Sequence, residues 1–473
     1  MTRLLVLGAG PAGLGAAFKL RQRDRASVTV VEQGQAVGGN AGSFALGEQR
    51  VDFGSHRLHP ACAPEILADI RGMLGDDLLV RPRHGRIRLR GRWIHFPFEP
   101  IDLAMRLDKG FAAGAFRDML VRLGPSRFED GASFEQVLER ALGPTICRSF
   151  YFPYAEKIWG LRPEEISPVQ AHRRVSASSF GKLLEKVFGS LRRRSPDPYR
   201  GRFLYPRRGF GSISEAYAER LTDLGGELLT GWTVTRLEGP SDSRPHWVAR
   251  AEREGQARSL EADWVWSTIP VTVLARLLAP APPDDILHAA RSLEFRAMLL
   301  VYLVLPVERF TEFDAHYFPS AEIRITRLSE PKNYTGSASP LGSTVLCAEL
   351  PCDVDDPVWS EDDAALGALV TEDLRKSGLA VPAAPTRVVV RRLPKAYPKY
   401  RRGFEVHFDA LDEWVGGVPR LLSFGRQGLF AHDNTHHALA MAYAAVESFE
   451  AGELDASRWA SHRETFSTHV VED

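Results

Sequence analysis

The sequence predicts an α/β protein with two interleaved domains, one built on a Rossmann-type parallel sheet and the other on an antiparallel sheet. An apolar run at residues 3–8 leads through a glycine-rich turn and a helical stretch into a second apolar run that ends on Glu32. Residues 297–305, 322–328 and 344–350 read as strands of an antiparallel sheet. At 473 residues, the chain is also longer than a single core usually supports.

The glycine-rich turn has the spacing of a dinucleotide-binding fingerprint. Gly8 permits the tight turn after the strand, Gly10 lets the backbone approach a pyrophosphate, and Gly13 lets the helix pack on the strand. The N-terminus of the helix provides unpaired N–H groups and a positive dipole for phosphates. Glu32, at the end of the second strand, can accept a hydrogen bond from a ribose hydroxyl. The complete unit therefore predicts a bound dinucleotide.

A second glycine pair, Gly38-Gly39, begins six residues after Glu32, and a short β-like stretch then leads to VDFGSHRLH at residues 51–59. An NAD-binding Rossmann unit does not need a second glycine pair at this short distance after the acidic residue. In this combination the sequence resembles the large superfamily of FAD-dependent proteins that includes amine oxidases, protoporphyrinogen oxidase, phytoene desaturases and UDP-galactopyranose mutase. The segments GGNA and GSHRLH are most similar to the mutase-related branch, whereas amine oxidases usually carry Arg where this chain has Asn40.

The resemblance implies a glutathione-reductase-type Rossmann domain that binds FAD, interleaved with an α+β substrate domain. No Cys or His stands in a recognisable attachment motif, so non-covalent binding is expected. The implied FAD-binding domain comprises residues 1–75, 203–285 and 419–473, and the implied substrate domain comprises residues 76–202 and 286–418. Val234 matches a strand residue that contacts adenine through its backbone in this superfamily.

The closing stretch GRQGLFAHDNTHHALAM, residues 425–441, holds three histidines and an aspartate between a glycine-containing turn and an apolar run. A metal site would need such groups on one face, with a partner acid elsewhere. No matching cluster stands upstream, and the two adjacent histidines are expected to point in different directions, so no metal is predicted. The resemblance implies instead that this block lies against FAD, with a helix N-terminus at the pyrimidine edge of the flavin. Arg426 would meet the phosphate or ribityl side, and Asp433 or Asn434 would cap the helix.

These matches give the expected cofactor contacts, and they make His56 and Arg57 the candidate catalytic residues. The cofactor contacts are predicted at Gly8, Gly10, Pro11, Ala12, Gly13, Glu32, Gln33, Gly38, Gly39, Asn40, Gly54, Ser55, His56, Val234, Gly425, Arg426, Asp433, Asn434 and Thr435.

Residues 152–175 resemble a block that borders the substrate cavity in the mutase-related branch. The candidates for contacting substrate are Tyr154, Lys157, Trp159, Arg173, Arg327 and Tyr397. A helix and turn packed by aromatic side chains is the alternative interpretation of this block. The arginines at 173, 174, 324 and 327 could hold an anionic substrate through bidentate contacts, although surface arginines are the simpler explanation.

Two further helices are predicted from local patterns. Ser212 and Glu215 form an S-x-x-E capping box that is expected to open one of them. Residues 178–194 alternate apolar and basic positions at helical spacing. This pattern is typical of a solvated amphipathic helix, with a membrane-surface helix or a mobile lid as alternatives.

The composition indicates which classes of partner and which cellular compartment are expected. Lys plus Arg and Asp plus Glu both total 60, so the chain lacks the basic excess that nucleic-acid binding requires. The four cysteines form no CxxC pair and no zinc spacing, which indicates buried or free thiols in a reducing compartment. No apolar run reaches the ~18 residues of a membrane span, and no signal peptide is recognisable. We expect a cytoplasmic protein with a small-molecule substrate, no transmembrane span and at most a peripheral membrane contact.

Three functions are compatible with these features. The first, which we expect, is an FAD-dependent oxidoreductase (oxidase, dehydrogenase or desaturase) that removes a hydride from a small organic substrate. The second is a non-redox sugar-nucleotide mutase, favoured by GGNA and His56 but weakened by His432, where mutases carry a tyrosine. The third is a binding protein like the Rab GDP-dissociation inhibitors, which share the fold without using flavin, and the intact fingerprint argues against it. Simple amine oxidation is not expected, because the strand AMLLVYL lacks the lysine that amine oxidases often hold near the flavin.

Overall fold

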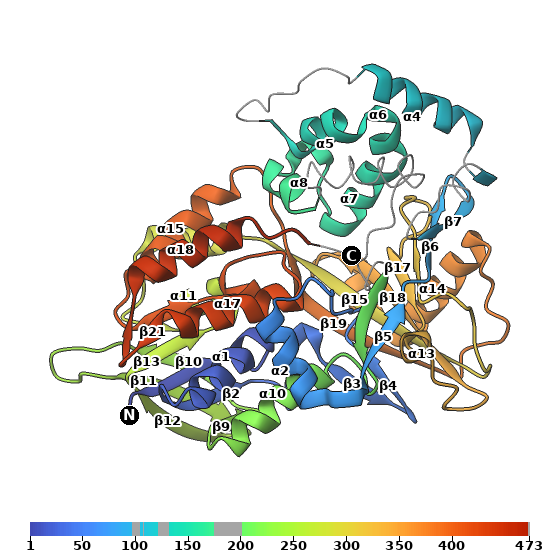
Figure 1. Ribbon diagram of the computed structural model, residues 1–473. Helices are drawn as coiled ribbons and strands as arrows, with labels where there is room; N and C mark the ends of the chain where they lie inside the picture. The colour runs from blue at the N-terminus through green and yellow to red at the C-terminus, as the bar shows by residue number, and fades with distance from the viewer. Residues whose placement is uncertain (97–104, 107, 122–131, 175–200, 472–473) are drawn as a thin grey trace.

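The computed structural model describes residues 1–96, 105–106, 108–121, 132–174 and 201–471, and it confirms the mixed α/β fold. A five-stranded parallel sheet lies beneath helices α1 (Pro11–Gln22) and α17 (Thr435–Glu447) in the lower left part of Figure 1. Its strands, in spatial order, are β20 (Leu421–Ser423), β13 (Trp264–Ser267), β1 (Arg3–Leu7), β2 (Ser27–Glu32) and β9 (Glu227–Thr230).

Both faces of the parallel sheet are buried, which explains why its strands are continuous apolar runs rather than alternating ones. In β1, Leu4 and Val6 enter one core, while Leu5 and Leu7 enter the other. The first core is covered by α1, α17, α2 (Pro64–Leu74), α10 (Ser212–Asp223) and α18 (Ala456–Ser467). The second is covered by α11 (Val271–Leu277), α12 (Asp284–Ser292), α15 (Phe404–Gly416) and a sheet of β12 (Gln256–Ala262), β11 (Trp247–Arg253), β10 (Thr233–Glu238) and β14 (Leu278–Ala279).

A seven-stranded sheet forms the second large layer. Its order is β19 (Arg387–Pro398), β15 (Phe295–Leu305), β18 (Thr344–Cys352), β17 (Arg327–Ser329), β16 (Ala315–Tyr317), β6 (Gly85–Leu89) and β7 (Arg92–Phe96). Its pairs are antiparallel except β16 with β6. One face packs on α14 (Asp363–Ser377), and the other contacts the hairpin of β3 (Ser43–Leu46) and β4 (Gln49–Asp52). The hairpin also contacts the start of α10, one of the helices that cover the parallel sheet. The two sheets thus draw on alternating segments of the chain, while the boundaries between the domains stay a prediction.

A separate layer of helices lies above the sheets in Figure 1. It contains α4 (Lys109–Val121), α5 (Phe134–Leu142), α6 (Pro144–Ile146), α7 (Phe152–Trp159) and α8 (Pro168–Arg174). The helix predicted over residues 178–194 lies outside the described residues. The smaller elements are the pair β5 (Leu78–Pro82) and β8 (Arg202–Pro206), the pair β21 (Phe449–Glu450) and β22 (Glu453–Leu454), α13 (Pro331–Thr335) and α16 (Gly425–Gly428).

Two findings bear on compartment. None of the helices in the described part of the chain combines the length and the apolar character that crossing a bilayer requires. All four cysteines lie in the described ranges, where they are buried and form no disulfide.

The strand predicted over residues 322–328 is largely wrong, because only its last two residues belong to β17. The reason is a buried side chain, Asp373, whose carboxylate accepts the backbone N–H groups of Arg324 at 2.7 Å and Ile325 at 3.1 Å. These backbone donors are satisfied by a carboxylate, so the segment does not need a neighbouring strand.

The capping box predicted for Ser212 and Glu215 is also wrong. Helix α10 begins at Ser212 itself, with Gly211 as its N-cap and no side-chain cap. The N–H of Gly211 donates to the hydroxyl of Ser43 at 2.7 Å, and Glu215 forms an ion pair with Arg50. The neighbouring β3–β4 hairpin therefore fixes the start of this helix instead of the local motif.

Candidate functional site

Two glycine turns that are separated in the sequence meet at the N-terminus of α1. The N–H of Gly38 donates to the carbonyl oxygen of Ala9 at 2.8 Å. A Cβ atom on Gly39 would lie 3.7 Å from the Cα atom of Gly10. Gly38 and Gly39 both have positive φ angles, +107° and +52°, which a glycine adopts without strain. The two glycine motifs of the sequence thus form one surface beside the carboxyl ends of β1 and β2.

The three fingerprint glycines have different surroundings. A Cβ atom on Gly13 would lie 2.0 Å from the carbonyl oxygen of Gly8, so this position is closed by close packing of helix on strand. A Cβ atom on Gly10 would meet nothing within 4 Å, and Gly10 is the N-cap of α1 without any side-chain cap. Pro11 and Ala12 follow as the first helical residues. The structure therefore leaves space and uncapped helix N–H groups at the position predicted for a pyrophosphate.

Glu32 lies beside this turn, at the end of β2. One oxygen of its carboxylate accepts the N–H of Ala9 at 2.9 Å, and the other accepts the N–H of Gly34 at 2.7 Å. Its carbonyl oxygen accepts the N–H of Trp232 at 3.0 Å, which brings the start of β10, and with it Val234, near the same end of the sheet. Each carboxylate oxygen keeps a second lone pair that can accept a ribose hydroxyl. Gln33 is exposed next to it.

Replacing Glu32 by alanine is expected to raise the dissociation constant for FAD roughly 10- to 150-fold, about 1.5–3 kcal/mol, because a charge-assisted hydrogen bond is lost. Titrating the apoprotein with FAD measures this. Glu227→Ala on the neighbouring strand β9 is the matched control, since that carboxylate pairs with Arg258 on the surface. Equal FAD affinity of the Glu32 variant and the wild type would show that the ribose contact is misassigned.

The closing stretch forms a third turn at the same place. Gly425 has a φ angle of +81°, and a Cβ atom there would lie 2.7 Å from the methyl group of Ala12 in α1. Helix α17 begins at Thr435, and Asn434 is its N-cap in a capping box with His437. Of the two predicted caps, Asn434 is therefore the one that the structure uses.

Arg426 and Asn40 tie this region to the seven-stranded sheet. The guanidinium of Arg426 donates to the carbonyl oxygens of Asp433 at 3.3 Å and Ala396 at 2.7 Å. The side-chain amide of Asn40 donates to the carbonyl oxygen of Lys395 at 3.4 Å, and that of Gln427 donates to the same oxygen at 2.9 Å. The end of β19 thus holds both the second glycine turn and the closing turn, a junction that the sequence reasoning missed.

Asp433 is buried and has a different role from helix capping. Its carboxylate lies 3.2 Å from Arg173, 3.4 Å from the Nδ1 atom of His469 and 3.8 Å from the Nδ1 atom of His437. Burial acts to raise the pKa of Asp433, but the hydrogen bond with His469 and the charge of Arg173 outweigh it and hold this pKa below its ordinary value. Asp433 therefore links helix α8, helix α17 and the residues after α18.

His437, His469 and Asp433 lie close enough together to be considered as metal ligands. The rings of His437 and His469, however, are stacked, with centroids 4.3 Å apart and planes 14° from parallel. A ligating lone pair lies in the plane of its ring, so two stacked rings cannot both point at one ion. The expectation that the adjacent histidines point apart is wrong, since the rings of His436 and His437 lie 4.1 Å apart. That no metal binds stays a prediction.

The turn after β4 carries the two candidate catalytic residues. The Nε2 atom of His56 lies 2.8 Å from the carbonyl oxygen of Phe53, so this nitrogen carries the proton and Nδ1 is left as an acceptor. The ring stacks on Phe210 at 5.3 Å. Burial lowers the pKa of His56, and the charge of Asp52 acts in the opposite direction without reversing the shift. His56 is therefore a neutral imidazole with one free lone pair.

Arg57 is held by partners that the sequence reasoning did not identify. Its guanidinium lies 3.1 Å from Asp314 and 3.4 Å from the hydroxyl of Tyr317. It also lies over the rings of Phe203 and Tyr334, at 5.1 Å and 5.3 Å. A buried carboxylate thus balances the charge of this arginine, and aromatic rings surround it.

Arg327 and Glu349 fix the same turn from the seven-stranded sheet. Glu349, which is 4% exposed, accepts two hydrogen bonds from Arg327, at 2.9 Å and 2.8 Å. It also accepts the backbone N–H of Ser55 at 2.8 Å, and a Cβ atom on Gly54 would lie 3.3 Å from it. The hydroxyl of Ser55 bonds to that of Tyr334. The ion pair therefore holds the turn predicted to face the flavin.

The other substrate candidates divide into two groups. Trp159 and Tyr397 come together around His432, with ring centroids 6.4 Å and 4.8 Å from it. Tyr154 instead stacks on Phe150 at 5.9 Å, in an apolar cluster that includes Tyr317.

Lys157 and the arginines are already engaged by protein groups. The amino group of Lys157 donates to the carbonyl oxygens of Phe318, Ser320 and Ile325, and burial lowers its pKa to about 7. Arg324 pairs with Asp373 at 3.6 Å. With Arg173 on Asp433 and Arg327 on Glu349, each of the three arginines whose side chains are described lies beside a carboxylate. The side chain of the residue at 174 lies outside the described part.

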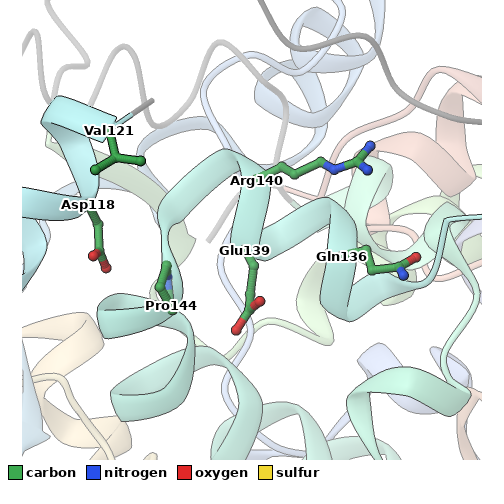
Figure 2. Close-up of a pocket in the computed structure, with 6 residues that line it drawn as sticks. All are labelled: Asp118, Val121, Gln136, Glu139, Arg140 and Pro144. Atoms are coloured by element: carbon green, nitrogen blue, oxygen red, sulfur yellow. The ribbon is translucent and has the colours of Figure 1, made fainter. Parts of the chain in front are cut away.

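A surface hollow with a volume of about 370 Å³ lies in the helical layer, between α4 and the α5–α6 turn (Figure 2). Asp118 and Val121 of α4 line it from one side, and Gln136, Glu139, Arg140 and Pro144 line it from the other. None of the residues predicted to contact cofactor or substrate lines this hollow. It is therefore separate from the candidate site.

Comparison with known proteins agrees with this geometry. The chain matches the family described as flavin containing amine oxidoreductase over residues 11–423. Human protoporphyrinogen oxidase is 24% identical over an alignment 472 positions long, and the match covers 91% of this chain and 91% of that protein. The crystal structure of reduced UDP-galactopyranose mutase has a TM-score of 0.80 at 19% identity and covers 100% of both chains. Putrescine oxidase bound to putrescine has a TM-score of 0.64 at 16% identity and covers 94% of this chain and 98% of that one. The two structural likenesses establish the fold alone.

Proposed function

Because this chain belongs to the flavin containing amine oxidoreductase family, we propose that it is an oxidoreductase that binds FAD non-covalently and removes a hydride from a small organic substrate. The observation that carries this proposal is the convergence of Gly10, Gly39 and Gly425 on the uncapped N-terminus of α1, with open space at Gly10. A backbone surface of this kind, with Glu32 beside it, fits the pyrophosphate and ribose of a dinucleotide.

In this proposal, bound FAD would supply the hydride-accepting chemistry. The residues of the chain position the reacting groups and handle the proton. His56 is the candidate proton acceptor, because its Nε2–H is committed to the carbonyl oxygen of Phe53 and its lowered pKa leaves Nδ1 unprotonated. Arg57 and the turn before it are fixed by Asp314 and Glu349, so the arrangement is preorganised.

The charge balance around the turn favours an oxidoreductase over a mutase. A sugar-nucleotide substrate carries a pyrophosphate, which unpaired arginines hold best. Arg57 and Arg327 are each neutralised by a buried carboxylate instead. For the same reason we do not propose that Arg173 or Arg327 selects an anionic substrate. The similarity to human protoporphyrinogen oxidase over 91% of both chains supports a redox reaction on an organic substrate.

A flavin-dependent sugar-nucleotide mutase is the second candidate. Its support is the fold-level likeness to reduced UDP-galactopyranose mutase over the whole chain, together with the GGNA word at residues 38–41. Against it stands His432, which is buried against Trp159 and Tyr397 at the position where mutases carry a tyrosine.

The purified protein is expected to be yellow, and acid or heat is expected to release intact FAD, identified by chromatography, because no side chain is assigned a covalent link. Anaerobic mixing with reduced organic substrates, with porphyrinogens and amines as the first panel, is expected to bleach the oxidised-flavin absorbance for at least one of them. The parallel arm incubates the dithionite-reduced protein with UDP-galactopyranose. Isomerisation there, with no bleaching in the first arm, would establish the mutase. A colourless protein that FAD cannot reconstitute would overturn both functions.

A further inference from the structure

Helix α4 presents an unusual outer face. Phe116 and Leu120 are 53% and 50% exposed, Val121 is 81% exposed, and Met105 just before the helix is 73% exposed. Ala113, which is also exposed, Phe116 and Leu120 follow the three- and four-residue spacing of one helix face. Val121 extends this face at the last residue of α4, and Met105 precedes the helix. The other exposed large apolar side chains in the described ranges are Met1, Val80, Leu341, Val354 and Val406, which come from separate segments of the chain. We call Met105, Ala113, Phe116, Leu120 and Val121 the α4 face.

The opposite side of the helix accounts for how α4 is attached. Phe111 packs with Leu89 and Ile94. The carboxylate of Asp118 accepts the backbone N–H of Thr145 at 2.8 Å. The fold therefore buries the Phe111 side and leaves the α4 face outward, on the outer edge of the helical layer (Figure 1). Figure 2 shows Val121 on the last turn of α4, next to the hollow.

Basic side chains lie on α4, just before it and on the neighbouring β6–β7 turn. Arg106, Lys109 and Arg117 are exposed on α4 and just before it, and Arg90 and Arg92 join them from the β6–β7 turn. Arg92 donates to the carbonyl oxygen of Arg106 at 3.0 Å, which places that turn against the start of α4. Asp108 pairs with Arg90 at 3.7 Å and the buried Asp118 pairs with Arg117 at 3.4 Å, and Glu139 lines the hollow beside Val121. Arg92, Arg106 and Lys109 give this part of α4 a basic excess.

We propose that the α4 face docks this protein on an anionic lipid surface. Exposed aromatic and aliphatic side chains that are flanked by Lys and Arg are the combination that an interfacial helix uses, with the apolar side chains among the acyl chains and the cations at the headgroups. A second copy of the chain fits less well, because a symmetric contact would place each basic rim against its own copy. The proposal is independent of the chemistry that the flavin performs.

Co-sedimentation of the FAD-loaded protein with vesicles tests the proposal. Binding to phosphatidylcholine vesicles that contain phosphatidylglycerol is expected, with weaker binding to phosphatidylcholine alone and at high salt. The double variant Phe116→Asp/Leu120→Asp is expected to weaken binding about tenfold or more, because two carboxylates enter the contact. The matched control is Leu341→Asp/Val406→Asp, which changes two apolar side chains elsewhere that are even more exposed (80% and 71%) and is expected to bind like the wild type.

Two further measurements keep the outcomes distinct. FAD content and thermal midpoint are compared for all three proteins, and they are expected to agree because every substituted side chain is exposed. Light scattering after size exclusion gives the oligomeric state of each. No binding of the wild type to the anionic vesicles, or equal binding of the α4 double variant, would overturn the proposal. A wild type that is dimeric while the α4 variant is monomeric would assign the face to a second copy instead.

Discussion

Replacing Gly10 by alanine is expected to leave the fold intact and to raise the dissociation constant for FAD about 100-fold, about 2.8 kcal/mol. The backbone of Gly10 is extended, with a φ angle of −77°, and an added methyl group would meet nothing within 4 Å. The protein alone therefore accommodates alanine, and only a pyrophosphate lying against this backbone would be displaced. Titrating apoprotein with FAD, together with urea unfolding of the apoprotein, measures the two effects separately.

Gly13→Ala and Gly72→Ala complete this experiment. The Gly13 methyl group would lie 2.0 Å from the carbonyl oxygen of Gly8, so α1 must move and the apoprotein is expected to lose about 3 kcal/mol or more of stability. Gly72 lies in α2, away from the cofactor turns, and a Cβ atom added there would meet nothing within 4 Å, as at Gly10. Gly72→Ala is therefore the control. It is expected to change neither FAD affinity nor fold. If Gly10→Ala binds FAD as tightly as Gly72→Ala does, the pyrophosphate lies elsewhere.

The sequence was sufficient for those parts of the site in which the information is local. The strand, turn and helix at residues 3–22 are set by apolar runs and by glycines whose spacing has one geometric solution. The same holds for Gly38 and Gly39, whose positive φ angles only glycine tolerates well.

The partners of the charged residues could not be predicted, because they are distant in the sequence. Asp314 is 257 positions from Arg57, and Glu349 is 294 positions from Ser55. Nothing near Arg57 in the sequence indicates that its guanidinium pairs with a carboxylate. His469 likewise lies outside the stretch 425–441, although it contacts Asp433.

Local motifs also failed where tertiary contacts supply the same hydrogen bonds. The S-x-x-E motif at Ser212 has the right residues for a capping box, but Ser43 of the hairpin takes the backbone donor at the start of α10. Asp373 does the same for residues 324 and 325, which therefore need no neighbouring strand. In both places a side chain from a distant segment outweighs a local preference that is worth about 1 kcal/mol.

The ion pair between Arg327 and Glu349 is the strongest case of such a distant partner, and it carries a large expected effect. Glu349→Ala is expected to cost about 3–5 kcal/mol of stability, because it leaves the partly buried Arg327 guanidinium unpaired and the N–H of Ser55 without its acceptor. The double variant Arg327→Met/Glu349→Leu is expected to recover much of that loss, since neither charge is then buried alone. Urea unfolding of the single and double variants measures the difference.

The matched control for this experiment is Glu372→Ala, which removes an ion pair with Arg375 on the surface, where the two side chains are 40% and 66% exposed. Its expected cost is below about 1 kcal/mol.

FAD titration of the folded double variant separates the role of Glu349 in the site from its role in the sheet. Because that variant restores stability without restoring the acceptor for the N–H of Ser55, it is expected to bind FAD more weakly than the wild type. If the double variant is stable and binds FAD with wild-type affinity, Glu349 supports the seven-stranded sheet and has no part in holding the flavin-facing turn. If Glu349→Ala is as stable as Glu372→Ala, the buried pair contributes no more to the fold than the exposed one.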